Sequence, residues 1–439
     1  MKLIYFHIDE LARDSIVASV LKKEFKKRGV TVIYGNRFSM RFLQKMPIFD
    51  LIILSGIPHF QHIFPDPGKL PENIVIMPTE AVGMATGNSK KIDVKYFGIN
   101  RDAGEPWHKT AKAFMLWGYD HLKPFEKQYP QYLEKCNVIG HPRLDKRCVK
   151  KQNKNSGENK KLRVGLVSRF SGVNPFHSKS IFETIHLGMR RKGAESPLFE
   201  NSPDHDVEDQ LYTEMIDLRV FFQIIEKLDL SKFEIWVRPH PRENRFFWER
   251  LSRENNLDIK ISDWDEPFSF WLSNIDFIVS PPSTSFYDAL SAGQSPICTM
   301  NIVKHRKRHV LTESDDNNQI LEHIRCPESV DEVIELLENP LKSEELSSEA
   351  REILLGQTAL DIAPNSLNNL ADACMKILET ASSPINKVKK RAFLALYKII
   401  VVSLSYVQQF RNHFVRGGEQ SASFALTLSR IRMINKLSD

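Results

Sequence analysis

The sequence predicts an α/β protein with two domains, each built around a parallel β-sheet. Short apolar segments typical of strands alternate with helical segments along most of the chain, as in a parallel sheet. The chain has 439 residues, and a single hydrophobic core stops growing at about 250 to 300 residues. A polar, Lys- and Asn-rich stretch at residues 150–162 is typical of an exposed linker. We therefore place the domain boundary there.

The first predicted domain covers residues 1–149. The segment 15–29 has the composition of a helix and ends at a glycine. The expected strands of this domain are KLIYFHI, VTVIYG, FDLIILSG, NIVIMP, KAFMLWG and NVIGHPRLD. Each is followed by Gly, Pro or a polar loop. Ligands of open α/β sheets bind at such carboxyl ends of strands.

The second predicted domain covers residues 163–380. Its expected strands are LRVGLVS, KFEIWVRPHP, DIKIS, IDFIVSPPS and SPICTMN, with helices between them. Residues 196–215 are acidic and irregular, and a loop of that length inside a domain is either a functional lid or a disordered insertion. Both interpretations stay open at this point.

The composition excludes several classes of protein. Hydrophobic residues make up 41% and charged residues 26%, which is the range of soluble globular proteins. The cysteines are odd in number, far apart and without a CxxC pair, which argues against a zinc cluster and a disulfide framework: Cys136, Cys148, Cys298, Cys326 and Cys374. The start MKLIYFHID is typical of a strand and lacks the apolar core of a signal peptide. We expect a reducing compartment, the cytoplasm.

The segment 386–439 is basic and amphipathic. It holds ten Lys and Arg residues but only Glu419 and Asp439 as acids, so its charge of +8 (10 − 2) exceeds the +6 of the whole chain. This concentration in one tail argues against a nucleic-acid groove. Residues 392–407 are mostly apolar but interrupted by Lys398, and they fall short of the roughly 20 residues that span a bilayer. The pattern favours an interfacial helix on anionic lipid, and the alternative is a helix packed on the protein.

The first chemical motif is RPHPRE, residues 238–243, at the end of a predicted strand. Pro239 and Pro241 fix the backbone on both sides of His240. The histidine can donate to a phosphate oxygen or carry a proton, and Arg238 supplies positive charge to the same anion. The alternative is a histidine that only caps a loop.

The second motif is SPPSTSFYDALSAG, residues 280–293, in which a buried strand leads into a hydroxyl-rich turn and a helix. Ser283, Thr284 and Ser285 stand at the helix start, where free N–H groups and hydroxyls favour anions. Plain N-capping by these residues is the alternative, and Asp288 adds a likeness to a capping box. Both motifs end strands of one sheet, so we expect them to converge on one phosphate. Ser168 and Arg169, on the first loop of the domain, are a further predicted phosphate contact.

Together the two motifs resemble the second-domain signature of GT-B glycosyltransferases that make bacterial surface carbohydrates. Within that group the sequence is most similar to sialyltransferase-like and Kdo-transferase-like enzymes, which use CMP-activated acidic sugars. The stretch 118–145, ending in GHPRLD, resembles the end of the first domain in such proteins. The resemblance implies two Rossmann-like domains with a facing cleft, plus C-terminal amphipathic helices.

The resemblance also implies the roles of the site residues. The HP motif and the Ser/Thr pair would hold the CMP moiety, and no cofactor is expected beside the nucleotide sugar. The predicted nucleotide-binding residues are Ser168, Arg169, Arg238, His240, Pro241, Glu243, Ser283, Thr284 and Ser285. His240 is also a predicted catalytic residue. No DxD-type motif stands in a convincing context, so no metal is expected.

The catalytic carboxylate is less defined, because the acidic motif of the sialyltransferase-like enzymes is not intact here. Glu80, in MPTEAVGM at a strand end, is the first candidate for deprotonating an acceptor hydroxyl, and a plain surface carboxylate is the alternative. Further candidates are Asp9 and Glu10 after the first strand, and Asp206 or Asp209 in the acidic insertion. Inversion and retention both stay open.

The sequence thus predicts transfer of a CMP-activated acidic sugar, Kdo-like or sialic-acid-like, onto a lipid-linked glycan or surface polysaccharide such as capsule or lipopolysaccharide. The expected location is the inner face of the cytoplasmic membrane, with the basic tail on anionic lipid and no nucleic-acid partner. One alternative is glycerophosphate transfer from CDP-glycerol, since teichoic-acid enzymes carry similar motifs. Another is a non-catalytic, membrane-bound assembly factor with a GT-B body.

Overall fold

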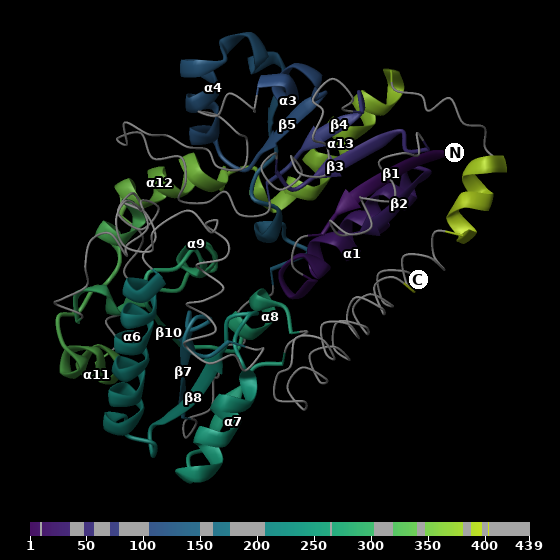
Figure 1. Cartoon of the computed structure of the whole chain (residues 1–439). Helices are drawn as coiled ribbons and strands as arrows, with labels where there is room; N and C mark the ends of the chain where they lie inside the picture. Colours follow the sequence, from purple (N-terminus) through teal and green to yellow (C-terminus); the bar gives the residue numbers. More distant parts are fainter. Residues whose placement is uncertain are drawn as a thin grey trace, which may run out of the picture. The chain divides into compact units, whose positions relative to one another are not determined.

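The computed structural model describes residues 1–8, 11–35, 48–56, 71–78, 105–149, 161–175, 207–263, 266–302, 319–339, 347–380, 388–396 and 403. These residues form two compact units (Figure 1). The first unit comprises the described residues up to 149 and those from Arg351 onward. The second lies within residues 151–350.

The first unit contains a six-stranded parallel sheet in the order β2-β1-β3-β4-β5-β6. Its strands are β1 (Lys2–His7), β2 (Val30–Gly35), β3 (Leu51–Leu54), β4 (Ile74–Ile76), β5 (Ala113–Leu116) and β6 (Cys136–Val138). β3, β4 and β5 are buried along their whole length. This is why they appear in the sequence as continuous apolar runs, as strands covered on both faces do.

The helical elements of the first unit are α1 (Leu11–Lys27), α3 (Glu105–Thr110), η3 (Tyr119–Leu122), α4 (Lys123–Gln128), η4 (Pro130–Lys135), η5 (Pro142–Leu144), α12 (Ser348–Thr358), η8 (Ala363–Asn365) and α13 (Ser366–Thr380). α1 stops where Gly29 adopts a φ of 72°, a left-handed conformation that favours glycine. The chain then turns directly into β2. One face of the sheet packs against α1 and α13, and the aromatic residues of α3 and α4 cover the other.

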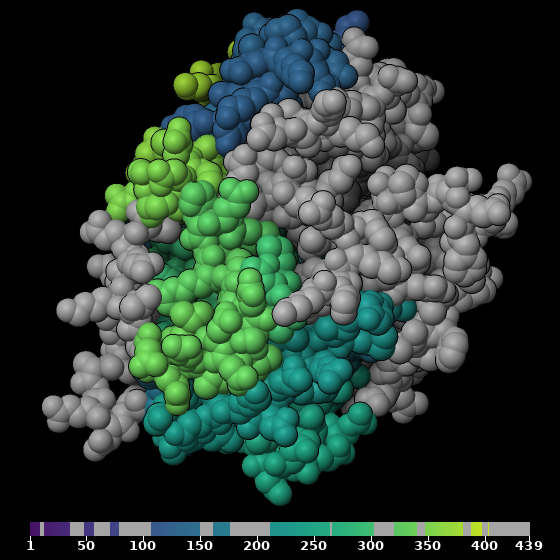
Figure 2. Space-filling model, turned by 90° about the vertical axis from the view of Figure 1, so that its left-hand side faces the viewer, coloured from purple at the N-terminus to yellow at the C-terminus, as the bar shows by residue number. Residues whose placement is uncertain are grey.

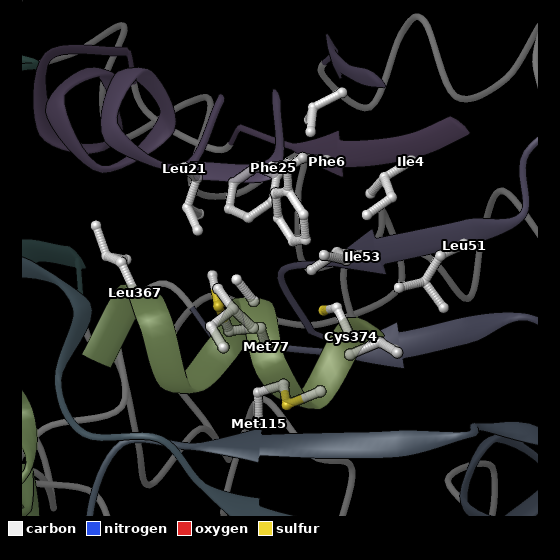
Figure 3. Packing of buried hydrophobic residues seen from close by; sticks show 14 of the residues in the cluster. Ile4, Phe6, Leu21, Phe25, Leu51, Ile53, Met77, Met115, Leu367 and Cys374 are labelled. Carbon is white, nitrogen blue, oxygen red and sulfur yellow. The ribbon is translucent and has the colours of Figure 1, made fainter. Parts of the chain in front are cut away.

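α13 corrects the predicted domain boundary. Leu367, Leu370 and Cys374 are fully buried against the first sheet and α1, and Figure 3 shows Leu367 and Cys374 among Leu21, Phe25 and Met115. The Asp145 carboxylate accepts a hydrogen bond from the Leu367 amide at 3.0 Å. The predicted second domain, 163–380, therefore extends too far, because its last helix returns to the first unit. The order of segments along the sequence does not show that this last helix packs on the first unit.

The second unit contains a five-stranded parallel sheet in the order β11-β10-β7-β8-β9. The strands are β7 (Leu162–Val167), β8 (Phe233–Arg238), β9 (Ile259–Ile261), β10 (Phe277–Ser280) and β11 (Ile297–Cys298). The helical elements are α6 (Val207–Lys227), α7 (Arg245–Glu254), α8 (Phe268–Leu272), α9 (Ser285–Ser291), η6 (Thr299–Ile302), η7 (Gln319–His323) and α11 (Val330–Glu338). The chain leaves β7 in one direction through β8 and β9, then crosses to the other side for β10 and β11.

α6 corrects the prediction of an irregular segment at 196–215. Residues from 207 onward belong to this helix, whose apolar side, including Leu211 and Phe221, is buried. The acidic residues masked that pattern in the sequence. α6 packs beside α11, and the Lys227 ammonium lies 2.6 Å from Asp331 across the pair. Figure 2 shows the surface of this part of the unit, where the green segment around α11 adjoins teal residues.

The start of the basic tail is helical at residues 388–396 and packs on the first unit. The Lys390 ammonium is buried and lies 2.7 and 2.8 Å from the two carboxylate oxygens of Asp50. Phe393 makes an edge-on contact with Phe49. This part of the tail follows the alternative of a helix packed on the protein, while residues 397–402 and 404–439 lie outside the described residues. None of the described helices is long and apolar enough to cross a membrane.

Candidate functional site

Three strand ends of the second unit lie side by side and carry both sequence motifs. β7 stands between β8 and β10, and Val167 at its end pairs with Arg238 at the end of β8. On the other side, the Ser280 hydroxyl donates to the Val167 carbonyl at 3.0 Å. Strand order reverses between β7 and β10, and ligands of open α/β sheets bind at such a switch point. The loops after β7, β8 and β10 therefore form the candidate site.

Glu243 joins the loops after β7 and β8. Its carboxylate is fully buried and accepts from the Phe170 amide at 2.8 Å, the His240 amide at 3.1 Å and the Trp248 indole at 3.3 Å. The Ser168 hydroxyl lies 2.7 and 2.8 Å from its two oxygens. A buried carboxylate with this many donors fixes the backbone of both loops.

Burial governs the protonation of this carboxylate. Loss of solvation raises the pKa of Glu243 to about 7, while the hydrogen bonds from Ser168, Phe170, His240 and Trp248 oppose the rise. Deprotonation thus occurs near neutral pH. The ionised form can accept from all four donors, but loss of solvation outweighs these hydrogen bonds, so the folded state favours the protonated carboxyl group.

His240 is positioned by its own loop. Its Nδ1 atom accepts a hydrogen bond from the Arg242 amide at 3.2 Å, and its carbonyl accepts from the Glu243 amide at 2.8 Å. A neutral ring whose Nδ1 is an acceptor carries its proton on Nε2. The Nε2–H group is the donor that such a ring offers to an anionic oxygen.

Arg238 lies at the edge of the site and faces β9. One of its guanidinium nitrogens donates to the Glu266 carbonyl at 2.6 Å, and the other lies 3.9 Å from the Glu266 carboxylate. Burial lowers the pKa of Arg238 to about 10, so the group stays charged at neutral pH. Its charge contributes to the local field, and its hydrogen bonds hold the loop that precedes α8.

The hydroxyl-rich turn after β10 is ordered by hydrogen bonds of its own. The Ser283 hydroxyl oxygen accepts from the Ser285 amide at 3.2 Å and from the Ser285 hydroxyl at 2.8 Å. Thr284 is exposed and its side chain makes no capping bond to the seven-residue helix α9. N-capping therefore explains the presence of a hydroxyl residue at Ser283 but not at Thr284.

Arg169 connects this turn to the loop after β7. Its guanidinium donates to the carbonyl of Pro282. The contact places a cation beside Ser283 and Thr284, within the switch point. The two motifs therefore stand at strand ends on either side of β7 and its loop, and their convergence on one phosphate stays a prediction.

Apart from Arg238, which is engaged with Glu266, the predicted nucleotide-binding residues divide into two groups. Arg169, His240, Thr284 and the half-buried Ser283 and Ser285 stand at the loop surface, as does Pro241. Ser168 and Glu243 are buried and bonded to each other, so they position the loops. Their direct contact with a nucleotide stays a prediction.

The predicted catalytic carboxylates are not placed by the structure. Glu80, Asp9, Glu10 and Asp206 lie outside the described residues, and of Asp209 only its position in the backbone of α6 is described. Across the residues that are described, no group of three or more His, Cys, Asp or Glu side chains could hold a metal ion.

Two residues that contribute to the site were not among the predicted ones. Arg242 is exposed, and its amide orients the His240 ring. Trp248 is fully buried and donates to Glu243. Arg242 was visible as a second cation inside RPHPRE. Trp248 gave no such signal, because a tryptophan in an amphipathic helix is usually a core residue.

No known protein family matches the sequence, and no curated protein is significantly similar to it. The structure is similar to that of a variant of the wall teichoic acid polymerase TagF, with a TM-score of 0.51 and 10% identity over 86% of this chain and 89% of the other. It is also similar to S. aureus MnaA with UDP, with a TM-score of 0.46 and 10% identity over 88% and 100% of the two chains. For UDP-GlcNAc 2-epimerase from Neisseria meningitidis bound to UDP-GlcNAc, the values are 0.46 and 12% over 86% and 100%. The two parallel sheets and the likeness to TagF confirm the predicted α/β fold class.

Proposed function

We propose that the protein is a glycosyltransferase of the GT-B type that binds the phosphate of a nucleotide-activated sugar at the ends of β7, β8 and β10. One observation supports the proposal: Arg169, His240 and the Ser283–Ser285 turn follow three neighbouring strand ends at the switch point of the second sheet. Their backbones are fixed by the buried Glu243 and by the Arg169 contact to Pro282.

The chemistry of this site suits a nucleotide leaving group. The Arg169 guanidinium supplies charge, the Nε2–H of His240 donates a hydrogen bond, and the hydroxyl of Thr284 adds a donor. Donors held in place before the reaction stabilise the negative charge that develops on a departing phosphate. The site needs no bound cofactor for this role.

The sequence motifs favour a CMP-activated acidic sugar as the donor and a lipid-linked glycan or surface polysaccharide as the acceptor. Glu80 is the proposed base that takes the proton of the acceptor hydroxyl. The basic tail beyond residue 396 is proposed to hold the protein at an anionic membrane surface on the cytoplasmic side, since residues 388–396 are engaged with the first unit. A chain ending after Leu396 should lose its binding to phosphatidylglycerol vesicles.

Glycerophosphate transfer from CDP-glycerol is the second candidate. The likeness to a wall teichoic acid polymerase favours it, because the same fold supports that chemistry in another protein. The two reactions differ in the bond they form. Transfer from a CMP-sugar makes a glycosidic bond and releases CMP, whereas transfer from CDP-glycerol makes a phosphodiester, so mass spectrometry of the product distinguishes them.

Nucleotide binding is tested by thermal unfolding in the presence of CMP, CDP or UDP. A ligand at 100 times its Kd stabilises the folded state by about 2.7 kcal/mol. We expect CMP to raise the Tm of the native protein and to leave that of His240→Ala nearly unchanged. His240→Ala should also abolish transfer while the protein stays folded. Absence of any nucleotide effect would instead favour a non-catalytic assembly factor.

A further inference from the structure

Two cysteines that are distant in sequence are neighbours in the second unit. Ile297 on β11 forms a parallel bridge with Arg325, and the Cys298 amide donates to the Arg325 carbonyl at 2.8 Å. Advancing one residue along both segments places Cys298 opposite Cys326. Neighbouring strands lie about 4.7 to 4.9 Å apart, and the α-carbons of a disulfide are usually about 4.4 to 6.8 Å apart. The backbone spacing therefore permits a bond between the two sulfurs.

The two side chains also point to the same side. Both belong to a small cluster with Phe286 and Leu321, whereas Ile297 lies in the larger core on the opposite face of the sheet. The Cys326 thiol donates to the Leu321 carbonyl at 3.6 Å, and the neighbouring Cys298 thiol is close enough to affect its ionisation. Cys298 is fully buried and Cys326 is half-buried, so an oxidant reaches Cys326 first.

Cys326 differs from the other cysteines in reactivity. The neighbouring Cys298 thiol lowers the pKa of the Cys326 thiol, although burial opposes this effect. Burial raises the pKa of Cys136, Cys148 and Cys374 to about 12. Thiolates are the species that peroxides oxidise, and reactive cysteines of this kind often stand beside a second cysteine that resolves the first product.

We propose that Cys326 and Cys298 form a reversible disulfide when the protein meets hydrogen peroxide. The Cys326 thiolate attacks one peroxide oxygen, the O–O bond breaks, and the departing hydroxide takes up a proton to give water and a sulfenic acid. The sulfur of Cys298 then attacks the Cys326 sulfur, the S–O bond breaks, and the Cys298 proton leaves with the hydroxyl as a second water. Two thiols are oxidised and one peroxide is reduced.

The disulfide also bears on the candidate site. Phe286 belongs to the same cluster as both cysteines and directly follows Ser285, at the start of α9. Drawing the two sulfurs from contact to bonding distance moves the packing around Phe286, and we infer that this weakens nucleotide binding at the Ser283–Ser285 turn. This second step rests on the proposed function, whereas formation of the disulfide does not.

The bond is tested on the full-length protein with stoichiometric hydrogen peroxide, followed by alkylation and peptide mass spectrometry without reduction. We expect a peptide that links Cys298 to Cys326, its disappearance after dithiothreitol, and its absence in Cys298→Ser and Cys326→Ser. Cys136 is the matched control, because it is also half-buried but has a raised pKa, and it should stay alkylatable. Oxidation of Cys136 as fast as Cys326, or conversion of Cys326 to sulfinic acid without the link, would overturn the proposal.

The coupling is tested by the Tm increase that CMP causes, measured on reduced and oxidised protein. We expect the increase to shrink on oxidation, to return with dithiothreitol, and to be insensitive to peroxide in Cys298→Ser. A full CMP effect in protein that carries the disulfide would overturn the coupling and leave the disulfide in place. A missing CMP effect in the reduced protein would contradict the proposed function. The linked peptide would still test whether Cys298 and Cys326 form a disulfide.

Discussion

The Ser168 hydroxyl lies 2.7 Å from the carboxylate of Glu243, and both residues are shielded from solvent. Ser168 follows β7 and Glu243 ends the HP loop after β8, so this contact fastens two of the three loops that form the candidate site. Both residues were expected to touch the nucleotide. Because both residues are buried, we expect them to act by holding the loops that carry Arg169 and His240 in place.

Ser168→Ala should therefore weaken nucleotide binding through its effect on Glu243. The variant leaves Glu243 with one donor fewer and loosens the β7 loop. We expect a loss of about 1 to 2 kcal/mol in stability and at least a severalfold rise in the Kd for CMP, measured by calorimetry. Ser273→Ala is the matched control, since this buried serine donates to the Phe270 carbonyl on α8 and away from the loops. An equal rise in Kd for both variants would refute the positioning role.

Glu243 should make the stability of the protein depend on pH. Its folded-state pKa of about 7 lies above the 4.5 of an unperturbed carboxyl group. A raised pKa means that the folded state holds the proton more tightly, so this stabilisation is complete below pH 4.5 and is lost as the pH rises toward 7. The difference amounts to about 3 kcal/mol.

Glu243→Gln removes this titration. Urea unfolding at pH 5 and pH 8 should show that the free energy of unfolding falls by about 3 kcal/mol less in the variant than in the native protein. Identical changes in the two proteins would show that the carboxyl titrates elsewhere in the pH range.

The second sheet and its motifs could be predicted from the sequence, because its strands are short apolar runs followed by Pro, Ser or Thr. The sequence was insufficient for the direction of individual side chains at the site. Nothing in RPHPRE distinguishes the buried Glu243 from the exposed Arg242, because the distinction depends on Trp248 and Ser168, which come from other elements.

Contacts between segments that lie far apart in the sequence could not be predicted either. α13 has the pattern of an amphipathic helix, and this pattern does not show which sheet the helix packs against. Only the tertiary structure shows that its apolar side covers the first sheet. The same holds for Lys390, which has the appearance of one basic residue in a solvated run but is buried against Asp50.

Leu370→Ala tests the assignment of α13 to the first unit. Leu370 is fully buried in the core below β1 and β3, and removing such a side chain costs about 2 to 5 kcal/mol. Hydrogen exchange should rise in β1 and β3 and stay unchanged in β7 and β8. Leu355→Ala on α12 is the control, because this leucine is exposed and its loss should be nearly neutral. Faster exchange in β7 and β8 would support the original span of 163–380.

The buried pair between Lys390 and Asp50 should be costly to break from one side. Asp50 also accepts a hydrogen bond from the Leu3 amide at 2.7 Å, so its charge is held beside the start of β1. Lys390→Met leaves that charge buried without its cation, and we expect the free energy of unfolding to fall by about 3 to 5 kcal/mol.

Asp50→Asn keeps an acceptor for the Leu3 amide but removes the charge that Lys390 neutralises. Combining the two substitutions removes both charges, and the double variant should be more stable than Lys390→Met alone. A double-mutant cycle by urea unfolding measures the coupling, and additive losses would mean that helix 388–396 is held by Phe393 and its apolar neighbours instead of by the ion pair.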